Sequence, residues 1–239
     1  MSASHAAKQT GRATTPAGKT GKVGRPRHSA PLRAGASARE QILDAAAEMF
    51  SEQGYAAVST RKIAEAVGVK QATLYYHFGS KEDILAGLLA GTVTPSLAFA
   101  ARLPSTEEPP HAQLFALAYY DVGMLCVSPW NIGALNFLPE VRSERFAEFR
   151  RDRELLCQEY GRQITNGVER GLFSVDSTDV ATQLVFALAE SVIGMRSDDI
   201  DIDPSLPQMI ATSCLRLLAC PAAEIEVAVE TGKRLQSLA

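Results

Sequence analysis

The stretch TRKIAEAVGVKQATLYYHFGSK, residues 60–81, decides the fold of this chain. Ile63 and Val67 stand four residues apart, which is the spacing of one face of a short helix. Gly68 follows at the position where a helix often closes with a left-handed residue, a conformation that glycine adopts at little cost. The first half of the stretch therefore predicts a short helix that ends in a tight turn.

A second short helix is predicted directly after that turn. Leu74 and Phe78 are also four residues apart, so both can pack back onto the first helix. Two short helices joined by a glycine turn form the helix-turn-helix pattern, whose second helix fits the major groove of DNA. Its outer side is rich in hydrogen-bonding groups: Gln71, Thr73, Tyr75, Tyr76 and His77. Spacing alone leaves two interpretations open, a DNA-reading element and a small helical core with a polar surface.

The particular residues favour the first interpretation. Twelve residues carry a family pattern: Thr60, Ile63, Ala64, Gly68, Val69, Leu74, Tyr75, Tyr76, His77, Phe78, Lys81 and Leu85. Through them, residues 40–89 resemble the DNA-binding domain of the TetR (tetracycline-repressor-like) family, to which the segment LYYHFGSKEDIL is highly specific. One departure is Lys70, where the family often has Ser or Thr at the start of the recognition helix. A lysine cannot cap a helix, but it can reach a phosphate.

The resemblance assigns a DNA-contacting role to this stretch, and side-chain chemistry divides that role. We expect Gln71, Thr73 and Tyr75 to contact base edges, with Ala72 close to thymine methyl groups. We expect phosphate contacts from six further side chains: Thr60, Lys62, Lys70, Tyr76, His77 and Lys81. Arg61 has the chemistry for either role.

Charge is distributed unevenly along the 239 residues, although the formal net charge is only −3. Residues 1–36 hold seven Lys and Arg and no acidic residue. Residues 37–90 hold five basic and seven acidic residues, and the remainder holds 12 basic and 20 acidic residues. A basic front and an acidic rear suit a chain that presents only one end to a polyanion.

Residues 1–36 have few large apolar groups, so we expect a disordered basic arm. Within it, Gly24-Arg25-Pro26-Arg27 resembles the core of an AT-hook, in which Arg side chains lie in the narrow minor groove of A·T-rich DNA. Arg25 and Arg27 are therefore candidate DNA contacts. A flexible solubilising tail is the alternative interpretation.

The rest of the chain is predicted to be helical, since no segment alternates at period two long enough to form a sheet. The pattern S-x-x-E at Ser37 and Glu40 predicts a capping box that opens the first helix. Ser80 and Asp83 predict a second box opening a helix that Pro95 should kink or end. Asp176 and Asp179 are predicted to open a later one. Further helices are expected at residues 112–127, 131–138, 143–170, 180–195, 204–218 and 222–238.

We therefore predict an all-α chain with three parts. Residues 1–36 are the arm, residues 37–83 form a three-helix helix-turn-helix DNA-binding domain, and residues 84–239 form a helical domain for effector binding and dimerisation. The resemblance implies dimerisation through late helices that form a four-helix bundle. The expected faces are Ala181, Leu184, Val185, Leu188, Ala189 and Val192 on one helix and Ile210, Cys214, Leu217 and Leu218 on the other. The alternative is that these residues form only the core of one protomer.

The resemblance also implies a pocket whose ligand changes the spacing of the two DNA-binding heads. Candidate lining residues are Phe99, Phe115, Tyr119, Met124, Trp130, Phe137, Phe149, Tyr160 and Phe186. Together they favour a largely apolar effector with an aromatic or acyl group. Each aromatic residue taken alone is also typical of a protein core. Asp121, Glu140 and Glu190 lie in apolar surroundings and can orient polar or cationic groups.

Other classes of protein find little support. The sequence has no Gly-rich phosphate loop and no nucleophile–base constellation, so we expect neither an enzyme nor a bound cofactor. Asp199, Asp201 and Asp203 have the spacing of a calcium loop, but Ile210 stands where the bidentate Glu belongs, so we expect no metal. The four scattered cysteines fit reduced thiols in the cytoplasm, and no signal peptide or membrane span is expected.

The sequence thus predicts a DNA-binding transcriptional regulator. We expect a repressor that binds a palindromic operator as a homodimer and is released by a small apolar or aromatic effector. A ligand-independent architectural DNA-binding protein is the alternative.

Overall fold

The computed structural model describes residues 36–198 and 200–238, and these residues form helices without any strand. The all-α prediction is confirmed. The α-helices are α1 (Ala38–Gln53), α2 (Thr60–Val67), α3 (Gln71–His77), α4 (Lys81–Ala100), α5 (Pro110–Val127), α6 (Ala147–Glu169), α7 (Thr178–Ser197), α8 (Leu206–Leu217) and α9 (Ala222–Leu235). Short 3-10 helices join them: η1 (Tyr55–Ala57), η2 (Leu103–Thr106), η3 (Ile132–Phe137), η4 (Pro139–Arg142), η5 (Glu144–Phe146) and η6 (Gln236–Leu238).

Serine caps fix where the first helices begin. The Ser37 hydroxyl accepts from the Glu40 backbone N–H at 3.3 Å, and the Glu40 carboxylate accepts from the Ser37 N–H at 2.8 Å, which confirms the predicted capping box. Ser59 caps α2 by accepting from the N–H of Lys62. Lys70 precedes α3 without a side-chain cap, as its chemistry predicts.

The turn between α2 and α3 has the predicted glycine geometry. Gly68 has φ 78°, in the left-handed region, and its N–H bonds to the Glu65 carbonyl at 3.2 Å. The N–H of Val69 closes the turn on the carbonyl of Ala64 at 3.0 Å. A compact core holds the three helices together: Ile42, Ala46, Phe50, Ile63, Leu74 and Phe78 are all buried. The core fixes the outer face of α3 because Leu74 and Phe78 point inward.

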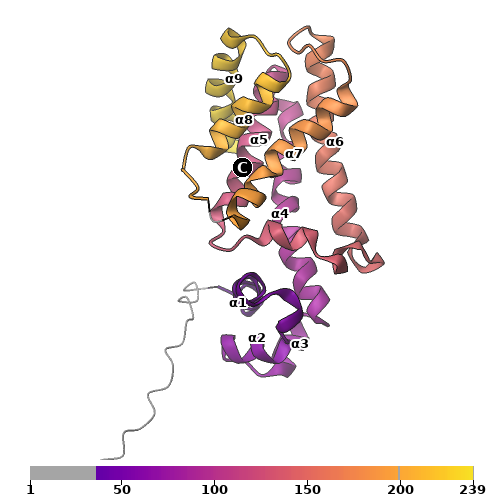
Figure 1. Cartoon of the computed structure of the whole chain (residues 1–239), viewed down its shortest axis with the longest axis vertical. Helices are drawn as coiled ribbons and strands as arrows, with labels where there is room; N and C mark the ends of the chain where they lie inside the picture. The colour runs from indigo at the N-terminus through magenta and orange to yellow at the C-terminus, as the bar shows by residue number, and fades with distance from the viewer. Residues whose placement is uncertain (1–35, 199, 239) are drawn as a thin grey trace, which may run out of the picture. The chain divides into compact units, whose positions relative to one another are not determined.

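Helices α1, α2 and α3 form the N-terminal head, and helix α4 leads from this head into the rest of the chain (Figure 1). Ser80 caps it by accepting from the N–H of Asp83 at 3.1 Å, but the carboxylate of Asp83 accepts from Arg145. Of the two effects predicted for Pro95, a kink or an end of the helix, the second is wrong, because α4 continues through Pro95 to Ala100. The boundary expected at residue 83 falls inside α4, which packs against α1 on the head side and against α5 and α6 beyond it.

Helix α5 is the centre of the C-terminal domain. All residues from Pro110 to Ala118 are buried, and α5 packs against α4, α6, α7, α8 and α9 (Figure 1). Close packing depends on one glycine: a Cβ at Gly232 of α9 would lie 2.5 Å from a ring carbon of Phe115.

Three predictions about local structure differ from the fold. Within the predicted segment 131–138, the structure has the 3-10 helix η3 (Ile132–Phe137) rather than an α-helix. Residues 144–146 form η5, so α6 begins at Ala147. Ser177 caps α7 by accepting from the N–H of Val180 at 3.3 Å, a role that the sequence had suggested for Asp176 and Asp179. The Ser177 hydroxyl, one residue after Asp176, has the same capping chemistry as an aspartate.

Two helices, α4 and α7, are long and apolar enough to cross a membrane by length and composition alone. Buried core helices pass the same test, and 44% of the α4 window and 33% of the α7 window are buried inside this fold. The lower value for α7 reflects apolar side chains on its outer face, which include Val180 and Leu184.

Candidate functional site

Polar side chains join α2 to α3 at the outer surface of the head. The hydroxyl groups of Thr60 and Tyr75 lie 3.1 Å apart, and the amide of Gln71 donates to the Thr60 hydroxyl at 3.3 Å. Three residues that the sequence predicts as DNA contacts therefore form one hydrogen-bonded cluster. Their donors and acceptors are already oriented, which lowers the cost of ordering them against DNA.

The outer face of α3 is exposed, as the pattern of apolar residues predicted. Lys70, Gln71, Ala72, Thr73, Tyr75 and Tyr76 are exposed, and His77 is half-buried. Tyr76 is 86% exposed and Tyr75 is 46% exposed. An isolated exposed tyrosine is ordinary, but two neighbours on a short helix beside a polar cluster fit a surface that binds another molecule.

The basic side chains of this surface are held in different ways. Arg61 bonds to Glu65 at 2.8 Å with both side chains largely exposed, so water screens the pair and a phosphate can compete for the guanidinium. The Lys62 ammonium donates to the carbonyl of Ala57 at 3.0 Å and has two further donors.

Lys81 is the exception among the expected phosphate contacts. Its ammonium donates to the carbonyl of Tyr55 and lies 3.9 Å from the centre of the Tyr55 ring. Burial lowers the pKa of Lys81 and raises the pKa of Tyr55 to about 12. Lys81 therefore holds η1 against the start of α4, and its predicted phosphate contact would have to share the ammonium with this internal role. Arg25 and Arg27 lie outside the described residues.

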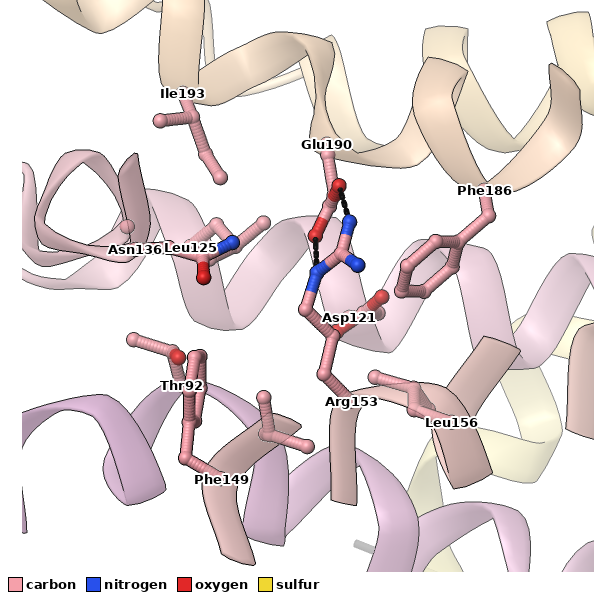
Figure 2. A pocket seen from close by; sticks show the side chains of 12 residues that line it. Thr92, Asp121, Leu125, Asn136, Phe149, Arg153, Leu156, Phe186, Glu190 and Ile193 are labelled. Carbon is pink, nitrogen blue, oxygen red and sulfur yellow. Dashed lines mark hydrogen bonds and ion pairs between the residues drawn. The ribbon is translucent and has the colours of Figure 1, made fainter. Parts of the chain in front are cut away.

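A cavity of about 20 Å³ lies among α4, α5, α6, α7 and η3 (Figure 2). Its lining residues are Thr92, Val93, Asp121, Leu125, Gly133, Asn136, Phe149, Arg153, Leu156, Phe186, Glu190 and Ile193. This volume is room for a single water molecule. A larger guest therefore has to displace a side chain.

A buried carboxylate forms the inner wall of this cavity. Asp121 accepts from the Ser96 hydroxyl at 2.7 Å and from the Tyr160 hydroxyl at 2.9 Å. Burial raises the pKa of Asp121 to about 6, although both hydrogen bonds oppose the shift. Burial also raises the pKa of Tyr160 well above its ordinary value. This polar cluster links α4, α5 and α6 inside an apolar core.

An ion pair also lines the cavity. The guanidinium of Arg153 donates twice to the carboxylate of Glu190, from Nε at 2.8 Å and from Nη2 (Figure 2). The same guanidinium lies 4.9 Å from the centre of the Phe186 ring. The Arg153 side chain is 34% exposed and that of Glu190 is 19% exposed, so the pair stands between cavity and solvent.

The structure brings only part of the predicted pocket together. Phe149 and Phe186 line the cavity, and so do Asp121 and Glu190. Seven of the predicted pocket residues do not line this cavity: Phe99, Phe115, Tyr119, Met124, Trp130, Phe137 and Tyr160. Glu140 is exposed outside the cavity. The ring centres of Phe99 and Tyr120 lie 4.5 Å apart and those of Phe115 and Tyr119 lie 5.9 Å apart, with both rings stacked and both phenylalanines buried in the core.

Sequence reasoning missed Arg153 as a cavity residue. It stands in a charged run of α6, residues 148–153, for which a solvated helix face is the simplest interpretation of the sequence. One signal was available: Arg153 lies four residues after Phe149 and three before Leu156, both of which are buried.

The predicted dimerisation faces point largely into the protomer. Buried within it are Ala181, Val185, Ala189, Val192, Ile210, Cys214 and Leu218. Leu188 is half-buried, whereas Leu184 is 51% exposed and Leu217 is 39% exposed. For the seven buried residues the alternative interpretation, a protomer core, describes the structure. The apolar pattern alone could not separate the inner face of α7 from its outer face, because both faces are apolar.

Among the described residues, no three His, Cys, Asp or Glu side chains gather as a metal site. Asp199 lies outside the described residues, while Asp203 receives the backbone N–H of Ser205 at 2.7 Å. Cys157, Cys214 and Cys220 are buried, and burial raises the pKa of each thiol.

A helix-turn-helix head with an exposed recognition helix, joined by a long helix to a helical domain with a polar-lined cavity, defines the class of DNA-binding regulators. The family model of bacterial regulatory proteins of the tetR family matches residues 42–88. The crystal structure of AmtR from Mycobacterium smegmatis is similar over 87% of this chain and 98% of that one, with 44% identity and a TM-score of 0.77. The chain belongs to the TetR family of transcriptional regulators.

Other proteins are similar to this chain over a shorter segment or in fold alone. The transcriptional repressor KstR2 of Mycobacterium tuberculosis is 44% identical over 55 residues, which cover 23% of this chain. The match spans only 28% of the length of that repressor. The TetR-family regulator PfmR of Thermus thermophilus shares the fold, with a TM-score of 0.65 at 23% identity over 75% of this chain and 97% of that one.

Family membership settles the coarse function. The chain is a DNA-binding transcriptional regulator of the helix-turn-helix type, and its relatives include repressors. The TetR family is not a family of enzymes, so the expectation of a non-enzymatic protein is confirmed at that level.

Proposed function

We propose that this protein is a repressor that binds a palindromic operator as a homodimer and is released by a small effector held in its C-terminal domain. The observation that carries the proposal is the exposed outer face of α3. Gln71, Thr73 and Tyr75 present hydrogen-bonding groups there, and the cluster with Thr60 orients two of them. An α-helix with such a face fits the major groove of DNA.

The contacts divide into two kinds. Gln71, Thr73 and Tyr75 read base edges, with Ala72 near thymine methyl groups. The residues that hold phosphates are Thr60, Lys62, Lys70, Tyr76 and His77. Lys81 contributes a phosphate contact with the same ammonium that donates the hydrogen bond to the Tyr55 carbonyl. Arg61 contacts either a base or a phosphate. Arg25 and Arg27 of the basic arm reach into the adjacent minor groove. These assignments place sequence reading on α3 and orientation on its surroundings.

The dimer forms through the outer faces of α7 and α8. One recognition helix spans only a few base pairs, so useful specificity requires two half-sites. Apolar or small side chains are exposed along both helices: Val180, Leu184, Ala187, Gly194, Met209 and Leu217. Small residues allow two helices to approach closely. The faces of both helices thus fit the four-helix bundle that the family resemblance implies.

The effector acts through α4 and α6. Both helices line the cavity, α4 with Thr92 and α6 with Phe149 and Arg153. Both also reach the head, because Arg145 just before α6 bonds to Asp83 in the first turn of α4. A ligand that moves α6 therefore changes the position of α4, which follows α3 in the chain and packs against α1 of the head. The protein works in the bacterial cytoplasm, where its DNA target lies.

Fluorescence anisotropy with DNA from upstream of the protein's own gene tests this proposal. We expect Gln71→Ala to lower affinity for the preferred site by about 5- to 150-fold, the cost of one base contact, while leaving affinity for random DNA unchanged. Lys70→Ala should weaken binding to all sequences and reduce the salt slope by about 1. Lys233→Ala, an exposed lysine of α9, is the control. Equal binding of the preferred site by the wild type and by Gln71→Ala would overturn the assignment.

A further inference from the structure

Three ionisable side chains from three helices meet at the cavity. Asp121 comes from α5, Arg153 from α6 and Glu190 from α7 (Figure 2). Two are carboxylates and only one is a cation. The site therefore has an excess of one negative charge when both carboxylates are ionised.

The single cation is committed to one of the two carboxylates. Arg153 donates twice to Glu190 and covers the ring of Phe186 at 4.9 Å. Asp121 receives its hydrogen bonds from two neutral hydroxyl groups, those of Ser96 and Tyr160. A buried carboxylate without a cation bound to it attracts a positive ligand, and its pKa of about 6 reflects the same burial.

Arg153 already shows what kind of group the site accepts. Its planar head combines a fork of N–H donors that matches a carboxylate with a face that lies on an aromatic ring. The side chain is one-third exposed, so it can turn into solvent at modest cost, since partly exposed ion pairs contribute little. The cavity of about 20 Å³ would then grow by the volume of a guanidinium head.

We propose, building on the effector role assigned to this domain above, that the cavity binds a small organic cation, an amine, amidine or guanidine. Its nitrogen head lies between Asp121 and Glu190 and against the ring of Phe186, in the place that Arg153 now fills. An anionic ligand would meet two carboxylates for one guanidinium. A purely apolar ligand would leave the buried charges without a partner.

Matched probes of similar size and different charge test this proposal on the full chain by isothermal titration calorimetry at pH 7.5. One set is methylguanidinium, N-methylurea and acetate, and a larger set is benzamidine, benzamide and benzoate. We expect saturable binding of at least one cation and none of its neutral or anionic counterparts. Equal binding of a cation and its neutral counterpart, binding of the anions alone, or no binding by either set would overturn the proposal.

The direction in which Arg153→Met changes ligand affinity distinguishes a cation site from an anion site. Arg153→Met removes the resident guanidinium but keeps a long side chain, so it should tighten cation binding by about tenfold. An anion site would lose its only cation and bind more weakly. Arg151→Met, an exposed arginine two residues away on the same helix, is the matched control and should leave the cation affinity unchanged.

The carboxylates provide the complementary variants. Glu190→Gln and Asp121→Asn should each weaken cation binding by tenfold or more, whereas Glu169→Gln at the exposed end of α6 should not. Unchanged affinity in both cavity variants would contradict the proposal.

DNA binding is measured separately on the same samples. Specific operator binding without cation binding rejects this inference and keeps the repressor function. Cation binding without specific operator binding keeps this inference and rejects the repressor function.

Discussion

Tyr76 is the most exposed of the large hydrophobic side chains in the described residues, at 86%. Its hydroxyl is free to reach a phosphate oxygen when α3 lies in the major groove. We expect Tyr76→Ala to weaken binding to the operator and to its single-base variants by the same few-fold factor, because a phosphate contact carries no sequence information. Anisotropy titrations on a panel of operator variants measure this. Loss confined to one base position would refute the phosphate role.

Asp121 links the stability of the fold to pH. Burial raises its pKa from 3.8 to about 6, so the folded protein binds a proton that the unfolded chain releases in this window. The groups that face this carboxylate are Tyr160 and Arg153 on α6, Glu190 on α7 and Cys214 on α8. The contribution of Asp121 to the free energy of unfolding therefore falls by about 2 kcal/mol as pH rises from 4 to 7.

Asp121→Asn should remove that dependence. Denaturant titrations at pH 4, 5, 6 and 7 should show the variant gaining stability relative to the wild type as pH rises, with most of the change between pH 4 and 6. Asp176→Asn, at an exposed position, should run parallel to the wild type. Parallel curves for Asp121→Asn would show that the buried carboxylate is ionised at the same pH in both states.

At the residue scale, sequence reasoning located the polar face of α3 because helix periodicity forces it outward once Leu74 and Phe78 are buried. It could not foresee Arg153 in the cavity or Lys81 bonded to Tyr55. Long charged side chains can turn toward solvent or toward a neighbour, and only the packing of helices that are distant in sequence decides between the two.

Among the elements, α5 and α9 pack so closely that one methyl group is decisive. A Cβ at Gly232 would lie 2.5 Å from a ring carbon of Phe115 and 3.1 Å from the carbonyl oxygen of Ala112. We expect Gly232→Ala to destabilise the fold by about 1–3 kcal/mol through overpacking. Gly91→Ala on α4, where a Cβ meets nothing within 4 Å, should instead stabilise it by about 0.4–1 kcal/mol. Chemical denaturation measures the free energy of unfolding of both variants. Equal changes in Gly232→Ala and Gly91→Ala would contradict the close packing of α5 and α9.

The pair Arg145–Asp83 connects η5 and α6 to the first turn of α4, directly after the recognition helix. Both side chains are partly exposed, so losing the pair should cost at most about 1 kcal/mol of stability. Because coupling between two sites is reciprocal, operator DNA should slow amide exchange in α6 of the wild type. We expect Arg145→Met to reduce that protection while operator affinity changes little.

Hydrogen-exchange mass spectrometry measures this coupling, with Arg151→Met as the control on the exposed face of α6. Full protection of α6 in Arg145→Met would mean that the two domains communicate through other contacts.

Most helices were predictable because caps, glycines and apolar periodicity are local signals. The exceptions are informative: Pro95 does not end α4, since the helix is held on both sides by packing, and residues 132–137 wind as a 3-10 helix where Gly133 lies against Ile193. Both outcomes depend on tertiary contacts that no local pattern contains.

For the whole molecule, we propose that the outer faces of α7 and α8 form the dimer interface and so set the oligomeric state. Leu184→Asp places a charge on the proposed dimer interface, where the side chain is 51% exposed in the protomer. We expect a monomer that folds normally and loses most of its operator affinity, because two half-sites are then no longer bound together. Val227→Asp, 48% exposed on α9, should remain dimeric. Sedimentation velocity measures the oligomeric state of both variants. A dimeric Leu184→Asp protein would show that the interface lies on another surface.

The architecture and family of the molecule followed from residues 60–81, yet the interface and the cavity did not. A sequence records which side chains are apolar, but α7 is apolar on both its inner and outer faces. The volume of a cavity and the side chains around it depend on how five elements meet. Val185 and Leu184 are neighbours with opposite roles in the fold, and only the packed structure tells them apart.

A footprint of the purified protein on genomic DNA at physiological salt tests the central claim most directly. We predict protection of a small number of palindromes with half-sites in successive major grooves, at least one of them near the protein's own gene or a neighbouring gene. Diffuse protection without sequence preference would contradict the account and would favour an architectural protein that binds DNA through its basic arm.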